Sequence, residues 1–177
     1  PVYPNKLDHF SLNVPKTARS GEPFQVRIIA RDAFDNIKFD LPDIRADVAI
    51  DYSGTGTLKK VDKALPSFRS GEMILSFEPI KVGKAKILVE EQVTHGRGES
   101  AEIEIGPAPL HHFIVQGPKA VVAGEEFLMT FSAMDINENL VTTYSTQGDG
   151  IVIHPSGNGV LEPTSVSARN FSHGQAK

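Results

Sequence analysis

Oxygen-bearing side chains gather in two short stretches of the chain whose spacing could bind a cation. The first stretch contains Asp32, Asp35 and Asn36, and the second contains Asp135, Asn137 and Asn139. Carboxylate and amide oxygens are the usual ligands of Ca²⁺, but both stretches lack the glycine and the glutamate that complete an EF-hand loop. Asp and Asn also close tight turns by bonding to nearby backbone. We therefore favour two structural turns, and a calcium site at these six residues remains the alternative.

The six histidines raise a second metal hypothesis, because His111 and His112 are adjacent. Neighbouring residues of a strand point to opposite faces, so we do not expect these two side chains to bind one ion together. A zinc site needs three or four converging ligands, and the chain has no cysteine. We predict no cofactor and no tightly bound metal.

Nucleophilic catalysis has no recognisable sequence pattern in this chain. No serine stands in a Gly-x-Ser-x-Gly elbow. The stretch Ser53-Gly-Thr-Gly56 resembles a phosphate loop, but it lacks the Gly-Lys-Ser/Thr ending. We interpret it as a turn and predict a non-enzymatic protein.

Charge and hydropathy exclude two classes of partner. The formal net charge is −4 with a pI near 5.9, whereas nucleic-acid binding needs a basic surface. No run of apolar residues approaches the length that spans a bilayer. We therefore predict no nucleic-acid partner and no direct membrane insertion. The start at Pro1, without a signal-like stretch, suggests a processed or excised piece.

A long internal repeat organises the whole chain. Residues 7–74 match residues 110–177 at 18 of 68 positions, on the single offset of 103 (110 minus 7) and without a gap. A repeat of about 100 residues has the size of one β-sandwich domain. We predict a first domain at residues 1–106, a proline-containing linker at 107–109 and a second domain at 110–177.

Period-two alternation of apolar residues predicts strands in both copies. In the first copy we expect strands at Phe10–Val14, Phe24–Ala30, Asp47–Tyr52, Met73–Phe77 and Ala101–Ile105. We expect four pairs to be equivalently buried: Phe10/Phe113, Phe24/Phe127, Ile28/Phe131 and Ala30/Ala133. Glycine-rich turns separate the strands, which predicts an all-β, immunoglobulin-like sandwich in each copy. The second copy stops at Lys177, the counterpart of Ile74, so it lacks its C-terminal strands in this chain.

These motifs resemble the tandem immunoglobulin-like repeats of bacterial surface and secreted proteins, of the invasin/intimin type or filamin-like. The resemblance rests on Ser20-Gly-Glu-Pro-Phe24 and Ala123-Gly-Glu-Glu-Phe127, on the Ala-x-Asp-x-x-x-Asn stretches ending at Asn36 and Asn139, and on Phe68-Arg-Ser-Gly71 and Phe171-Ser-His-Gly174. One departure is that Asp35 and Glu138 replace the glycine of the family's Asp-x-x-Gly-Asn turn. The resemblance implies an extracellular or cell-surface location.

A fold of this kind serves many functions, so several readings of function stay open. Our leading hypothesis is a non-catalytic spacer, stalk or adhesive region of a larger extracellular or surface protein. The alternative is an accessory module of a secreted enzyme whose catalytic domain lies outside this chain. A protein or carbohydrate ligand is compatible with either. We also expect strands from the rest of the parent chain or from another chain to complete the second domain.

Overall fold

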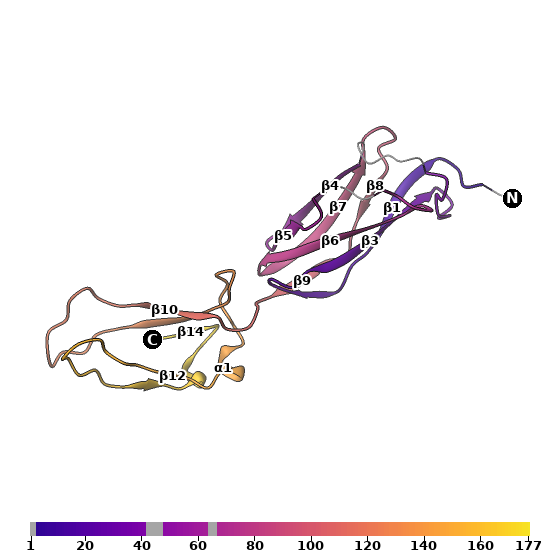
Figure 1. Ribbon diagram of the computed structural model, residues 1–177. Helices are drawn as coiled ribbons and strands as arrows, with labels where there is room; N and C mark the ends of the chain where they lie inside the picture. The colour runs from indigo at the N-terminus through magenta and orange to yellow at the C-terminus, as the bar shows by residue number, and fades with distance from the viewer. Residues whose placement is uncertain (1–2, 42–47, 64–66) are drawn as a thin grey trace. The chain divides into compact units, whose positions relative to one another are not determined.

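A computed structural model describes residues 3–41, 48–63 and 67–177 of this chain. The chain divides into two compact units, Pro1–Gly106 and Pro107–Lys177. In both units most of the regular secondary structure is strand, which confirms the expected all-β class (Figure 1). The residues expected to be a separate linker, 107–109, group with the second unit.

The first unit is a sandwich of two strand layers. Its strands are β1 (Leu7–Asn13), β2 (Thr17–Arg19), β3 (Phe24–Asp32), β4 (Val48–Gly54), β5 (Thr57–Lys60), β6 (Glu72–Lys81), β7 (Gly83–Glu91), β8 (Arg97–Glu99) and β9 (Ile103–Gly106). The order β1-β3-β6-β5 makes one layer, and β2, β9, β7 and β4 make the other. Strand β8 pairs with both β7 and β1, so it joins the layers at one edge. Strand β4 begins at Val48, and Asp47 lies outside the described residues.

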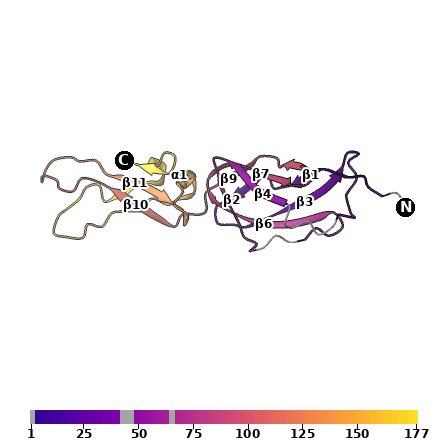
Figure 2. The ribbon, with the colours of Figure 1, turned by 90° about the horizontal axis from the view of Figure 1, so that it is seen from above.

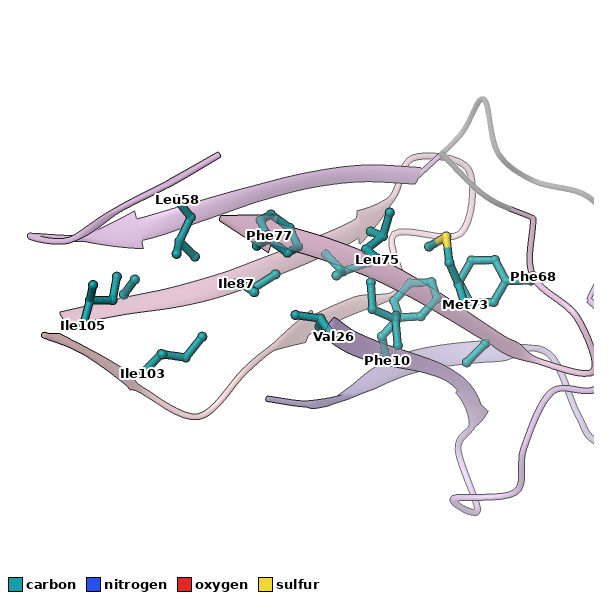
Figure 3. Close-up of a cluster of buried hydrophobic side chains, with 14 residues drawn as sticks. Phe10, Val26, Leu58, Phe68, Met73, Leu75, Phe77, Ile87, Ile103 and Ile105 are labelled. Atoms are coloured by element: carbon teal, nitrogen blue, oxygen red, sulfur yellow. The ribbon is translucent and has the colours of Figure 1, made fainter. Parts of the chain in front are cut away.

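The core of the first unit lies between the two layers, because each strand turns alternate side chains inward. On β3, Val26, Ile28 and Ala30 are fully buried and Gln25 and Arg27 are exposed. Leu75 from the adjacent strand β6, and Ile87 from β7 and Ile103 from β9 in the other layer, belong to the same core (Figure 3). Alternation has two exceptions here: Ile29 is only 6% exposed although it faces away from this core, and Ala101 is exposed and precedes β9.

The second unit is smaller and holds less regular structure. Its elements are β10 (His112–Gln116), β11 (Thr130–Met134), the single-turn helix α1 (Tyr144–Gln147), β12 (Ile151–Val152), β13 (Ser165–Val166), the 3-10 turn η2 (Ala168–Asn170) and β14 (Gln175–Ala176). Strands β10, β11 and β14 form one sheet, in which β10 and β11 lie side by side (Figure 2), and β12 pairs with β13. Phe113, Tyr144 and Phe171 pack together, with ring centroids 4.6–6.0 Å apart.

The two units share backbone details at equivalent positions. Phe10 pairs with Ala30 in the first unit, and Phe113 pairs with Ala133 in the second. Gly71 and Gly174 have φ of 80° and 83°, and an added Cβ would lie 2.8 Å from the Lys38 carbonyl oxygen or 3.0 Å from the Val141 carbonyl oxygen. The offset of 103 residues therefore holds for strand register and for turns that need a left-handed glycine, as well as for residue identity.

The units differ where the second has no counterpart of β7, β8 and β9. Strand β14 continues for only two residues, whereas its counterpart β6 runs for ten. Two of the four expected equivalences are wrong. Phe10 is 3% exposed whereas Phe113 is only partly buried. Phe127 is 39% exposed because no strand covers it, while Phe24 is partly buried and stacks on Phe77 of β6. Within the described residues 107–177, no strand therefore covers Phe127 as β6 covers Phe24.

Candidate functional site

A buried aspartate at the end of β3 forms the most developed polar site of the first unit. The Asp32 side chain is 1% exposed. Its Oδ1 accepts hydrogen bonds from the Phe34 and Asn36 amides, both at 2.9 Å, and its Oδ2 accepts one from the Asn5 amide at 2.8 Å. The Asn36 side-chain amide donates to both oxygens at 3.1–3.2 Å. We call Asp32 with these donors the first aspartate anchor.

The second unit repeats this arrangement around Asp135, the second aspartate anchor. Asp135 is fully buried, and its Oδ1 accepts from the Asn137 and Asn139 amides, both at 2.8 Å. Its Oδ2 accepts from the Ala108 amide at 3.0 Å. The Asn139 side chain donates to both oxygens at 2.9–3.2 Å. Every donor lies 103 residues after its counterpart in the first anchor, so the same hydrogen-bonding arrangement occurs once in each unit.

Hydrogen bonding keeps both aspartates ionised in spite of their burial. The Asn5 amide is the largest cause that lowers the pKa of Asp32 to about 2, from an ordinary 3.8, and the bonds from Asn36 and Phe34 add to it against the opposing effect of burial. For Asp135, burial raises the pKa, but the bonds from Asn139, Ala108 and Asn137 together lower it further. The net pKa of Asp135 is below its usual value.

Each anchor holds the chain segment that enters its unit. The Asn5 amide lies just before β1, and the Ala108 amide lies two residues beyond the last residue of β9. Gly106, that last residue, is itself held in the first unit, where its carbonyl accepts from the Ser20 amide at 2.9 Å. Only Pro107, with its fixed φ, stands between the Gly106 and Ala108 attachment points.

The predicted cation ligands do not all converge on the anchors. Asp32 and Asn36 meet, as do Asp135 and Asn139, whereas Asp35 turns to the surface, where its carboxylate lies 3.4 Å from Arg31 Nε and 3.5 Å from His9 Nε2. Both oxygens of each buried carboxylate already accept N–H donors. This geometry is that of the Asx-type turn that the sequence favours.

The residue between the anchor aspartate and asparagine adopts a left-handed conformation in both units. Asp35 has φ of 65° and Glu138 has φ of 59°. This is the position at which the turn motif named in the sequence analysis has glycine, and here Asp35 and Glu138 take the left-handed conformation instead. This costs conformational energy for any residue with a Cβ.

The two adjacent histidines lie closer together than we expected. His111 Nδ1 and His112 Nδ1 are 3.1 Å apart, because His111 precedes β10 and does not follow the alternation of a strand. Within the described residues, no three side chains from His, Cys, Asp and Glu gather as metal ligands would. That part of the chain also has no helix with the length and apolar character needed to cross a bilayer.

Sequence reasoning missed the Asn5 and Ala108 donors of the two anchors. Each precedes its aspartate by 27 residues, and each contributes a backbone amide, which any residue except proline provides. Their shared offset of 103 is the one signal that could have paired them.

Comparison with known proteins yields low similarity throughout. No family model and no curated protein matches the sequence. Domains 5–6 of the S-layer protein SbsC superpose with a TM-score of 0.41 and 11% identity, over 87% of this chain and 74% of that chain. The Lin-41 filamin domain gives 0.37 and 16%, over 59% of this chain and 97% of that one. In SbsC domains 4–9 (0.39, 10%), the match covers 87% of this chain and 24% of that one. Because all three TM-scores are below 0.5, we assign the fold from the strand pairing of this chain and not from these superpositions.

Proposed function

We propose that this chain is a pair of non-catalytic spacer modules, of the invasin/intimin or filamin-like kind, within a protein that is secreted or displayed at a cell surface. Modules of this type act as spacers. Each one sets a distance along the chain, and a short connection to the next module restricts motion between the two. The two aspartate anchors carry the proposal, because each fixes the segment that enters its own unit.

The second anchor supports this role through the shortness of the free joint. Gly106 is fixed by Ser20 and Ala108 by Asp135, which leaves Pro107 as the only residue between two hydrogen-bonded positions. Proline removes one of the two soft dihedrals of that residue. A joint of this kind limits the independent motion of successive modules.

Nuclear spin relaxation of the whole chain tests the proposal. We expect the amides of both units to report one common rotational correlation time. Asp135→Ala releases Ala108, so the correlation times of the two units should shorten and diverge. Asp32→Ala is the matched control: it makes the same change in an equivalent anchor that holds Asn5, which does not lie between the units, and should leave joint tumbling unchanged.

The opposite outcomes would contradict the spacer role. Two distinct correlation times in the unmodified chain would show that the joint is already loose. An equal effect of Asp32→Ala and Asp135→Ala would show that the anchors support their own turns and have no part in the joint.

A further inference from the structure

The second unit has an open groove that none of the strands in the described residues fills. A cavity of about 410 Å³ lies between Phe127, Met129 and Phe131 on one side and Leu161, Glu162 and Pro163 on the other. Residues 127–129 and 161–163 belong to no strand. The groove is lined mainly by apolar side chains, and Phe127 is 39% exposed within it.

The first unit shows what occupies the equivalent place. Its counterparts of the two groove walls are the start of β3 and strand β5, and β6 lies between these strands and pairs with both. Leu75 and Phe77 of β6 stand opposite Val26 and Phe24, and both are almost completely buried. The groove is therefore the place of a strand with the alternation of Leu75-x-Phe77-x-Pro79.

Strand β14 leads directly into this groove. Ala176 pairs with Phe131 and Gln175 with Ser132, in the same register as Met73 with Ile28 and Glu72 with Ile29. Lys177, the next residue, lines the cavity. A strand in line with β14 would thus meet Met129 and then Phe127 without any change of register.

The charge on the groove wall differs from that of the first unit. In the first unit Lys59 pairs with Glu78 of β6 across the strands, with Nζ and Oε2 3.9 Å apart. The counterpart of Lys59 is Glu162, and Glu125 and Glu126 also line the groove. An occupant with an acidic residue at the Glu78 position would face like charge.

We propose that the groove of the second unit binds an extended strand in line with β14, with apolar residues at the Leu75 and Phe77 positions and a basic residue at the Glu78 position. Such a strand adds ladder hydrogen bonds to Phe127 and Met129, whose amides lie on the same side of the strand as the Ala133 amide that donates to Gly174, and it covers Phe127. This inference concerns a binding surface and does not depend on the spacer function.

The test extends the full chain behind Lys177 with copies of residues 75–81. One copy carries Lys at the Glu78 position and a second keeps Glu. A third carries Ser at the Leu75 and Phe77 positions, to remove the apolar contacts. Hydrogen exchange of the Phe127 and Met129 amides is the readout. We expect the Lys copy to slow exchange at least tenfold, the Glu copy to be weaker by up to about fivefold, and the Ser copy to have no effect. Adding Glu162→Lys should reverse the order of the first two.

Several results would overturn the proposal. Equal protection by the Lys and Glu copies, in both the unmodified and the Glu162→Lys chain, would show that the groove does not prefer a positively charged residue at the Glu78 position. Protection by a separate peptide with none from the attached copy would show that the strand does not continue β14. Sedimentation showing that the unextended chain is dimeric, with the Phe127 and Met129 amides already protected, would assign the groove to a second copy.

Discussion

At the scale of single residues, the aspartate anchors concentrate the polar chemistry of this molecule. A carboxylate that is almost fully buried would ordinarily take up a proton, but the donors around Asp32 and Asp135 offset the loss of water. The same donors fix a turn and the incoming chain. Changes at these residues should therefore have effects that differ from those at an exposed carboxylate.

Acid should weaken the first anchor in a defined range of pH. Because the pKa of Asp32 is about 2 in the folded state and near 3.8 when unperturbed, its contribution to stability is complete above about pH 4 and is lost as pH falls towards 2. We expect Asp32→Asn to lower the urea midpoint of the first unit at pH 6, and this difference should shrink between pH 4 and pH 2. A difference that stays constant over that range would contradict the assigned pKa.

The left-handed turn offers a second residue-scale prediction. Asp35 has φ of 65°, a conformation that glycine adopts freely and that costs other residues energy. Asp35→Gly should be about 1 kcal/mol more stable than Asp35→Ala in urea unfolding. The comparison with alanine matters because both variants lose the same carboxylate. Equal stability of the two variants would show that the backbone there is relaxed.

Calcium should leave the unfolding temperature of the chain unchanged. A cation at Asp32 or Asp135 would have to displace N–H donors from both carboxylate oxygens. A ligand that binds only the folded state raises stability by mass action. A shift of several degrees with calcium, reversed by a chelator and abolished by Asp32→Ala, would favour the calcium alternative.

The sequence indicated the anchors only in part. Asp32 and Asn36 have the side chains and spacing of a turn, and the repeat identified Asp135 and Asn139 as their counterparts. The donors Asn5 and Ala108 contribute main-chain amides, which have no residue-type signature. For that reason, side-chain patterns alone could not show that the anchors hold the entering chain.

At the scale of elements, strand pairing decides which alternating patterns become strands. Residues 24–32 form all of β3 because β1 and β6 flank them, whereas in the second unit only Thr130–Met134 form β11. The pattern in Phe127 and Met129 resembles that of Phe24 and Val26, but the partner strand is missing. Alternation of apolar residues thus identified the inward-facing side chains. It could not predict how exposed Phe127 would be, because that depends on whether a neighbouring strand covers it. The short helix α1 had no periodic signal, because four residues are too few to show one.

Two neighbouring residues of β6 test the inward and outward faces. Leu75 is fully buried and Ile74 is 53% exposed. Leu75→Ala should reduce the free energy of unfolding of the first unit by about 2–5 kcal/mol, through lost apolar contact and a new cavity. Ile74→Ala should change it by no more than about 0.5 kcal/mol. Comparable losses from both variants in chemical denaturation would contradict the assignment of the two faces.

At the scale of the whole molecule, the chain contains two copies of one module. Within the described residues, the second copy has no counterparts of β7, β8 and β9. The repeat extends from residue identities to strand register, left-handed turns and buried carboxylates. The sequence alone predicted two copies of one module, because a constant offset of 103 residues without gaps allows only one alignment of the copies. It could not show how the second unit packs without β7, β8 and β9 counterparts, since that depends on α1, β12 and β13.

Residue-resolved hydrogen exchange of the unextended chain tests this account most directly, because every position has an internal control 103 residues away. We expect the anchored amides Asn36 and Asn139 to be protected in both units. Among the strand amides, those of Phe24 and Val26 should be protected and those of Phe127 and Met129 should exchange at least tenfold faster, because only the first two face a paired strand, β6. Equal protection of these two pairs of amides in a monomeric chain would contradict the account, as would protection of Asn36 without protection of Asn139.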